Sequence, residues 1–320
     1  MSGTPAAGVV LFEDVSKFYG EVLGVNRVDL AIGAGITSLV GPNGSGKTTL
    51  MNLATGLLRP TEGRVSVLGI EPSDPERLFA KVGYCTQFDT YPRGISGWDF
   101  VHLYLKLSGL DSGRAAEAAR RAIARVGMTD AASRRIAGYS KGMKQRIKLA
   151  QAIAHDPQVL LLDEPLNGLD PLARSEVIEL LRSFAADGRT VVVSSHILHE
   201  VDELSDRVVL VHGGYIVAEG AIAGVRDEMA AERPLAVLVR CDRPGALAAR
   251  VFAEDHVVEA RIDPDGRGLL VRTRSSEQFY LLLNRLAAEG LVEVEAVVPA
   301  DEDVQAVYQY LIGSPTGAAS

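Results

Sequence analysis

Short apolar runs alternate with longer amphipathic stretches from Val9 to about Gly220. The runs are rich in leucine or β-branched residues, which is typical of buried strands, and the stretches between them have helical spacing. This alternation predicts an α/β fold, a mostly parallel sheet with helices on its faces. The expected strands cover residues 9–15, 25–32, 35–40, 82–85, 158–163, 190–195 and 207–212, and a helix is expected over residues 47–58.

Two segments depart from this alternation. Between Gly97 and His155 one helical pattern follows another with no convincing strand, which predicts an all-helical insertion over about residues 97–155. After Gly220 the expected elements follow the order βαββαβ, with a last helix over residues 302–313. This order predicts a separate, small α+β domain with a ferredoxin-like, split βαβ fold. The expected divisions are a disordered segment 1–8, a first domain 9–222, a second domain 233–314 and a tail 315–320.

Composition narrows the class of protein. The 320 residues carry a net charge of −8 and show no basic stripe, which argues against a nucleic-acid-binding protein. No apolar run approaches the roughly 18 residues that a membrane span requires. The N-terminus does not resemble a signal peptide, and the two cysteines form no disulfide framework. We therefore expect a soluble intracellular protein. The basic side chains around residues 120–135 are interpreted as a solvated helix face, with a binding patch as the less favoured alternative.

The segment GPNGSGKT, residues 41–48, matches the phosphate-binding pattern G-x-x-x-x-G-K-[ST] in full, between an expected strand and an expected helix. Gly44 and Gly46 allow backbone N–H groups to surround phosphate oxygens. Lys47 supplies a positive charge to the phosphates, and Thr48 offers its hydroxyl to Mg²⁺. A glycine-rich turn without a ligand is the less favoured alternative. The residues predicted to bind ATP here are Gly41, Pro42, Asn43, Gly44, Ser45, Gly46, Lys47, Thr48 and Thr49.

The apolar run VLLLDEP, residues 159–165, ends in two carboxylates. A buried strand that emerges at an active site brings its first acid beside the metal, so Asp163 is the predicted Mg²⁺ partner, through water. Glu164 is the predicted general base that polarises the attacking water. The plainer alternative is a helix cap after a core strand.

The segment YSKGMKQR, residues 139–146, resembles the signature sequence of ABC (ATP-binding cassette) proteins. Ser140 and Gly142 match the serine and the second glycine of that signature, and the resemblance implies that both contact ATP. The segment also precedes the acidic strand by about the length of one helix, as in the family. Three positions depart from the signature, at its leading leucine, its first glycine and its glutamine: Tyr139, Lys141 and Met143.

Four further positions resemble functional residues of the same family. Gln87 resembles the glutamine that contacts the metal and water and links to the membrane partner; otherwise it is a surface polar residue. His196 resembles the histidine that contacts the γ-phosphate; otherwise it caps a strand. Asp170, in LNGLD, resembles the acid of the loop after the catalytic glutamate. Tyr19 resembles the aromatic residue that stacks on adenine, with its neighbour Phe18 as a rival.

The resemblance covers about residues 9–220 and implies the family's architecture and chemistry. The implied fold is a P-loop ABC ATPase cassette, a mostly parallel sheet with an antiparallel β subdomain and a helical subdomain. The implied cofactors are ATP and Mg²⁺. The catalytic residues are expected to be Glu164, His196 and Gln87; the metal residues Thr48, Gln87 and Asp163; and the further ATP contacts Tyr19, Ser140, Gly142 and Asp170.

The resemblance also implies partners. Two cassettes face head to tail in this family, so Ser140 and Gly142 of one subunit cap the ATP of the other. We expect a second copy of the chain, or a paired cassette, and a separate permease that makes the membrane contact; no nucleic acid is expected. The chain is then a peripheral ATPase subunit at the cytoplasmic face of the cell membrane. Its signature and C-terminal domain look like those of bacterial drug and antibiotic exporters, and the alternatives are an importer subunit or a soluble ABC ATPase with a non-transport target.

Overall fold

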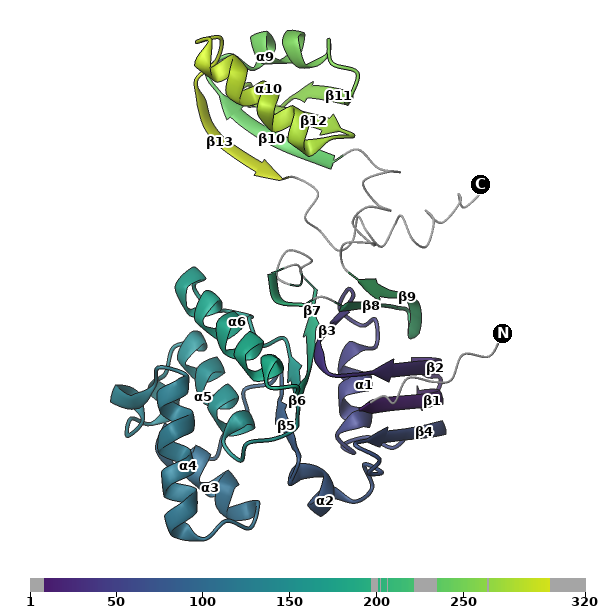
Figure 1. The fold of residues 1–320 in the computed structure, drawn as a ribbon, viewed down its shortest axis with the longest axis vertical. Helices are drawn as coiled ribbons and strands as arrows, with labels where there is room; N and C mark the ends of the chain where they lie inside the picture. Colours follow the sequence, from purple (N-terminus) through teal and green to yellow (C-terminus); the bar gives the residue numbers. More distant parts are fainter. Residues whose placement is uncertain are drawn as a thin grey trace. The chain divides into compact units, whose positions relative to one another are not determined.

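The computed structural model describes residues 9–196, 201, 203–205, 207–221, 235–263 and 265–299 (Figure 1). The chain forms two compact units, the first ending at Gly220 and the second beginning at Ala221. The disordered segment predicted for residues 1–8, the helix predicted for 302–313 and the tail 315–320 lie outside the described residues.

A six-stranded sheet forms the centre of the first unit, in the order β5-β6-β7-β3-β8-β9. The first five of these strands are parallel along the sheet. Since parallel strands bring their carboxyl ends to one edge of a sheet, the loops after β3, β6 and β7 meet there. The strand bounds are β5 (Val82–Cys85), β6 (Val159–Asp163), β7 (Thr190–Ser195), β3 (Gly35–Val40), β8 (Arg207–His212) and β9 (Tyr215–Ala221).

Every residue of β6 is buried, because both faces of the sheet are covered. Leu160 and Leu162 point into one core, which contains residues of the helices that follow β5 and β6. Val159 and Leu161 point into a second core, shared with helix α1 (Lys47–Ala54). This alternation explains why β6 reads in the sequence as an unbroken apolar run rather than as alternating polar and apolar positions.

An antiparallel three-stranded sheet, in the order β2-β1-β4, packs in the same core as α1. The sequence predicted two of its strands, with shorter bounds, but missed β4, in which only Val65 and Val67 are buried. It also missed β9, which has no fully buried residue, and the short helix α2 (Pro75–Phe79), whose five residues are too few to show a helical period. The bounds of the sheet strands are β1 (Val10–Tyr19), β2 (Val22–Ile32) and β4 (Glu62–Val67).

The helix predicted for residues 47–58 ends earlier, at Ala54. Gly56 has a φ of 73°, and a Cβ at this position would lie 2.1 Å from the carbonyl oxygen of Pro72. The chain can therefore leave the helix here in a left-handed conformation that only glycine fits.

The helical subdomain consists of α3 (Gly97–Leu107), α4 (Ser112–Arg125) and α5 (Lys141–Ile153), with two 3₁₀ turns before α5. Alanine side chains form the buried face of α4, which lets the neighbouring helices approach closely, while Arg120, Arg121 and Arg125 lie on its exposed face. The side chains that cap these helices and α6 (Pro171–Ala186) are Ser96, Asp111, Ser140 and Asp170, each accepting a backbone N–H bond.

The second unit contains a four-stranded sheet in the order β11-β12-β10-β13, with every neighbouring pair antiparallel. The described elements follow the order βαββαβ, as the sequence predicted. Val237 and Val239 of β10 share a core with Phe279 of α10. The bounds are β10 (Leu235–Cys241), α9 (Pro244–Val251), β11 (Val257–Ile262), β12 (Gly268–Thr273), α10 (Ser276–Ala288) and β13 (Val294–Pro299).

Candidate nucleotide site

The phosphate loop joins the carboxyl end of β3 to the start of α1. Gly44 and Gly46 have φ values of 80° and 114°, a region that L side chains rarely adopt. A Cβ on Gly46 would also lie 2.9 Å from the carbonyl oxygen of Gly24. Gly44 is therefore favoured by backbone conformation, and Gly46 by backbone conformation and close packing, as the predicted phosphate-binding loop demands.

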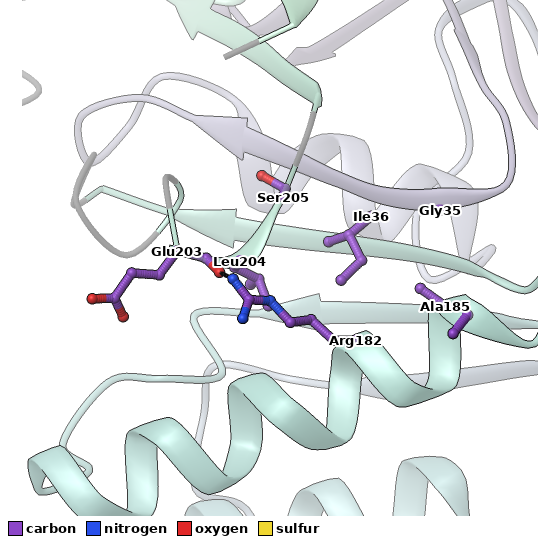
Figure 2. A pocket seen from close by; sticks show the side chains of 8 residues that line it. Gly35, Ile36, Arg182, Ala185, Glu203, Leu204 and Ser205 are labelled. Carbon is purple, nitrogen blue, oxygen red and sulfur yellow. Dashed lines mark hydrogen bonds between the residues drawn. The ribbon is translucent and has the colours of Figure 1, made fainter. Parts of the chain in front are cut away.

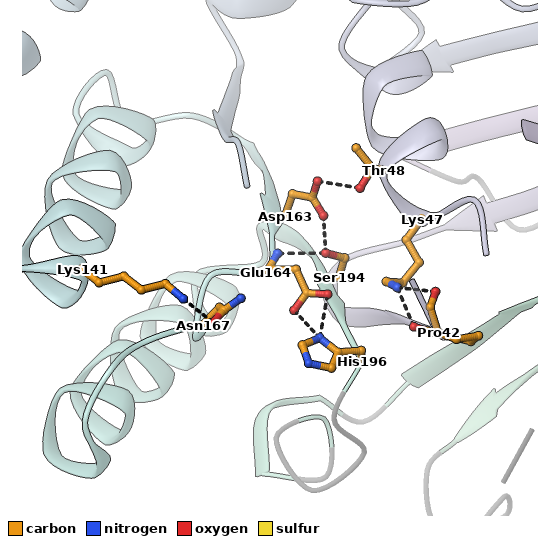
Figure 3. Close-up of polar contacts among 10 residues, drawn as sticks. Pro42, Lys47, Thr48, Lys141, Asp163, Glu164, Asn167, Ser194 and His196 are labelled. Carbon is orange, nitrogen blue, oxygen red and sulfur yellow. Dashed lines mark hydrogen bonds and ion pairs between the residues drawn. The ribbon is translucent and has the colours of Figure 1, made fainter. Parts of the chain in front are cut away.

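Lys47 bends back over its own loop. Its Nζ donates to the carbonyl oxygen of Gly41 at 2.5 Å and to that of Pro42 at 3.1 Å, and the residue is 5% exposed (Figure 3). Burial lowers the pKa of this ammonium, while the nearby carboxylates of Glu164 and Asp163 raise it. The loop thus contains a desolvated cation next to the N-terminus of a helix, a strong attraction for an anion.

Ser45 supplies a direct sign that the loop fits a phosphate group. Its Oγ is buried, and among the described atoms it has no hydrogen-bond partner. A buried hydroxyl without a partner is costly, and a phosphate oxygen in the loop satisfies it. Together with the glycine conformations and Lys47, this donor set matches the triphosphate of ATP.

Asp163 lies at the end of β6, 1% exposed, and two hydroxyls hold its carboxylate. Thr48 Oγ1 donates to Oδ2 at 2.9 Å, and Ser194 Oγ donates to Oδ1 at 2.5 Å (Figure 3). The structure therefore brings the predicted metal residues Thr48 and Asp163 into contact across 115 positions of sequence. A hydroxyl and a carboxylate are oxygen ligands of the kind that Mg²⁺ accepts.

Glu164 follows directly and has a φ of 52°, unusual for a residue with a long side chain. Its carboxylate accepts hydrogen bonds from His196 Nδ1, with distances of 3.0 and 2.9 Å to its two oxygens (Figure 3). Burial raises the pKa of Glu164, and the hydrogen bond from His196 lowers it. The predicted base and the predicted γ-phosphate sensor are thus in direct contact.

Ser194 was not predicted as a site residue, yet it connects the two acids. Its Oγ accepts from the backbone N–H of Glu164 at 2.9 Å while donating to Asp163. β7 is the parallel neighbour of β6, with Ser194 opposite Asp163 in the register. A signal was present in the sequence, because a serine at the end of the buried run TVVVSS is polar where the run is otherwise apolar.

The structure separates the two aromatic candidates for the adenine. The hydroxyl of Tyr19 lies 3.3 Å from Oγ1 of Thr49, in the first turn of α1, whereas Phe18 is tied to Thr61 through its backbone N–H. Consecutive strand residues point to opposite faces, so Tyr19 is the one directed to the phosphate-loop helix. Tyr19 is 44% exposed, which leaves its ring accessible. Stacking on adenine stays a prediction.

Gln87 lies just after β5 and is exposed. In the described part of the chain, no hydrogen bond joins its side chain to Thr48 or Asp163. Its main-chain carbonyl accepts from Lys148 Nζ at 3.3 Å, and the same ammonium contacts Asp89 at 3.1 Å. The loop is therefore anchored to α5, and the metal and catalytic roles of Gln87 stay predictions.

The signature residues form a second group. Ser140 is exposed and caps α5, accepting from Met143 N–H at 3.2 Å. Gly142 packs against the loop that precedes α6, where Asp170 caps that helix through Ala173 N–H at 2.9 Å. Within the described residues, no hydrogen bond connects this group to the phosphate loop of the same chain. Contacts of Ser140, Gly142 and Asp170 with ATP stay predictions.

A hollow at the other edge of the sheet is separate from this site. Figure 2 shows it between the start of β3, at Gly35 and Ile36, and the side chains of Arg182 and Ala185 on α6. The phosphate loop leaves the opposite end of β3, after Val40. The hollow therefore belongs to the amino edge of the strands and is no part of the phosphate site.

The contact between Glu164 and His196 leads to a pH prediction. A general base must be ionised, so hydrolysis falls as pH drops through the pKa of Glu164, and burial places that fall above the pH expected for a solvated glutamate. The variant His196→Phe keeps a ring but loses the N–H donor that lowers this pKa. We expect its acid limb of kcat against pH to move to higher pH, together with a lower maximal rate. A limb that stays in place or moves to lower pH would contradict the proposed interaction.

Comparisons with known proteins agree with this geometry. A family model described as ABC transporter matches residues 25–167. The chain is 30% identical over 308 residues to the bacitracin transport ATP-binding protein BcrA of Enterococcus faecalis, covering 95% of this chain and 96% of the relative. It is 30% identical over 301 residues to the daunorubicin/doxorubicin resistance ATP-binding protein DrrA of Streptomyces peucetius, covering 93% and 91%.

Solved structures match the first unit. The structure of an ATP-binding subunit of an ABC transporter superposes with a TM-score of 0.64 at 26% identity, covering 69% of this chain and 93% of that chain. A dimeric ATP-binding cassette in a post-hydrolysis state, bound to ADP and Pi, gives 0.63 at 26% identity, covering 67% and 98%. No helix in the described ranges is both long and apolar enough to cross a membrane. The chain belongs to the ABC transporter family and is one of its ATP-binding, ATP-hydrolysing subunits.

Proposed function

We propose that this chain is the ATPase of an exporter-type ABC transporter, working as a dimer beneath a separate permease at the cytoplasmic face of the membrane. The similarity to the bacitracin transport and daunorubicin/doxorubicin resistance subunits supports this reading, because it extends through both units of the chain. The cargo is then an antibiotic or drug of the kind that those names denote.

One observation carries the hydrolytic part of the proposal, the continuous set of contacts from Thr48 through Asp163 and Ser194 to Glu164 and His196. These contacts place the carboxylate proposed to bind the metal, Asp163, and the buried proposed base, Glu164, next to the phosphate loop. In the proposed reaction Lys47 and the loop N–H groups hold the β- and γ-phosphates. Glu164 orients the attacking water and accepts its proton, and His196 holds that carboxylate in place.

Magnesium fits the oxygen atoms gathered at the end of β6. Thr48 would hold it through its hydroxyl, with Asp163 and Gln87 contributing at the same position. When bound, Mg²⁺ neutralises negative charge on the phosphate oxygens. The two acids have different partners, which agrees with their different proposed roles. Two hydroxyls hold the carboxylate of Asp163, and the imidazole of His196 holds that of Glu164.

We expect a second copy of the chain because the residues proposed to contact ATP lie in two separate groups. Ser140 and the N-terminus of α5 form an exposed group of donors, and in the ranges that the structure describes this group makes no hydrogen bond with the phosphate loop of the same chain. In a head-to-tail dimer this group faces the γ-phosphate on the partner, so hydrolysis waits for closure. Solved structures of similar cassettes are dimeric, which supports self-association of this chain.

The test is to purify the chain from membranes together with the integral membrane protein that accompanies it, and to reconstitute the complex in liposomes. With Mg-ATP outside, we expect hydrolysis and movement of a fluorescent anthracycline probe, daunorubicin, into the lumen, away from the side that carries the ATPase. Liposomes containing the matched complex with Glu164→Gln are the control and should show neither.

Three results would redirect the proposal. Absence of hydrolysis by the complex would contradict the ATPase assignment. Movement of the probe toward the ATPase side would identify an importer. A chain that hydrolyses ATP but purifies without any membrane protein, bound instead to ribosomes or another soluble target, would support a soluble ABC ATPase.

A further inference from the structure

Lys141 stands where the family signature has a glycine, and its side chain crosses to the loop before α6. Its Nζ donates to Oδ1 of Asn167 at 2.9 Å (Figure 3). Asn167 lies three residues after Glu164. The side chain introduced at this position therefore joins the start of α5 to the segment that follows the proposed base.

The aliphatic part of the Lys141 side chain also packs closely, against Gly168. Gly168 has a φ of 77°, and a Cβ there would lie 2.4 to 2.9 Å from three carbon atoms of the lysine stem. Gly142 adds a second contact, since a Cβ on it would lie 3.5 Å from Cδ2 of Leu169. The signature glycine and the lysine thus both lie against residues 167–169, and a side chain at Gly168 would displace the lysine stem.

The residue that Lys141 contacts is itself hydrogen-bonded to Glu164. The backbone N–H of Asn167 donates to the carbonyl oxygen of Glu164 at 3.2 Å. Glu164 itself is fixed on its other side by the bond from its N–H to Ser194 and has the unusual φ of 52°. Asn167 therefore contacts Lys141 through its side chain and the catalytic residue through its backbone.

We propose that Lys141 is a positioning residue that couples the two ATP sites of the dimer. The proposal rests on the proposed function, in which Ser140 beside Lys141 contacts the partner's ATP while Glu164 acts on the chain's own ATP. Movement of the α5 N-terminus on closure around one nucleotide is transmitted through Asn167 to the base at the other. A glycine at position 141 has no side chain with which to make this link.

The hydrogen bond between Lys141 and Asn167 is not expected to stabilise the fold. Both partners are exposed, and a hydrogen bond between exposed groups contributes little to the free energy of unfolding. A second lysine makes a bond of the same length far from the site, Lys106 Nζ to Ser112 Oγ at 2.9 Å. Lys106→Met therefore removes the same chemistry and serves as the matched control.

The experiment is a double-mutant cycle on the full-length chain, with ATP hydrolysis measured against ATP concentration. We expect Lys141→Met and Asn167→Leu each to lower kcat about fivefold with little change in KM, and to reduce the cooperativity of the ATP dependence. The double variant should be no slower than either single variant. Lys141→Arg should restore the rate, and Lys106→Met should equal the wild type, with similar unfolding temperatures throughout.

The results that would contradict the coupling differ from those that would contradict the proposed function. A wild-type chain that does not hydrolyse ATP overturns the proposed function and the coupling with it. Additive losses, unchanged kcat, or a wild-type ATP dependence without cooperativity overturn the coupling alone. A raised KM at unchanged kcat in Lys141→Met also overturns it, since this result would identify the lysine as a direct phosphate contact.

Discussion

Replacing Glu164 with glutamine should lower the rate of ATP hydrolysis about a thousandfold while leaving ATP binding intact. The amide has nearly the same shape and can still contact His196, but it cannot accept the proton of the attacking water. The phosphate loop, with Lys47 and Ser45, is unchanged, so the variant should bind ATP and stay in the closed dimer. Single-turnover hydrolysis and size-exclusion chromatography in Mg-ATP measure the two effects.

Glu179→Gln is the matched control, because Glu179 is an exposed glutamate on α6 outside the site. It should hydrolyse ATP at the wild-type rate and show no trapped dimer. If Glu164→Gln kept a wild-type rate, the base would have to be another group. A slow variant that stayed monomeric in ATP would leave the base in place and contradict the shared site.

Replacing Lys47 with methionine should weaken ATP binding about a hundredfold, equivalent to about 2.7 kcal/mol. Methionine keeps the length and most of the volume of the buried stem but removes the charge that the triphosphate requires. It also removes the Lys47 donor from the carbonyl oxygens of Gly41 and Pro42, although Pro42 keeps its hydrogen bond from the backbone N–H of Ser45. Equilibrium binding of a fluorescent ATP analogue measures the loss.

Lys106→Met again provides the comparison, since it removes an exposed lysine that does not touch the loop. Circular dichroism should give the same spectrum for Lys47→Met as for the wild type. Unaltered affinity in a folded Lys47→Met variant would show that the loop N–H groups alone hold the phosphates. That result would remove Lys47 from the binding site.

The sequence predicted the central sheet well because its strands are buried on both faces. The bounds of β3, β5, β7 and β8 are as predicted, since an apolar run such as TVVVSS has one plausible structure. β4 was missed because its sequence, EGRVSV, buries only two side chains. The end of α1 was misplaced because the limiting contact, between Gly56 and Pro72, lies between residues 16 positions apart in the chain.

Some residues of the site could also be predicted from the sequence, and others could not. The predicted residues of the phosphate loop and the acidic strand were identified by local motifs, and the structure brings Thr48, Asp163, Glu164 and His196 together. Ser194 has no motif, and its role follows from strand register, which depends on which strands become neighbours. The contact of Lys141 with Asn167 was equally invisible, because a departure from a motif does not indicate what the new side chain touches.

The single hydroxyl of Ser194 has an evolutionary consequence. It holds the carboxylate of Asp163 and the backbone of Glu164 at once, so we expect a substitution at this position to disturb the proposed metal residue and the proposed base together. Selection for a slower or faster transporter is therefore steered away from the end of β7. Over the residues that the structure describes, the proposed link from Lys141 to Asn167 makes no contact with Asp163, so we expect a change there to affect the base while leaving the metal residue in place.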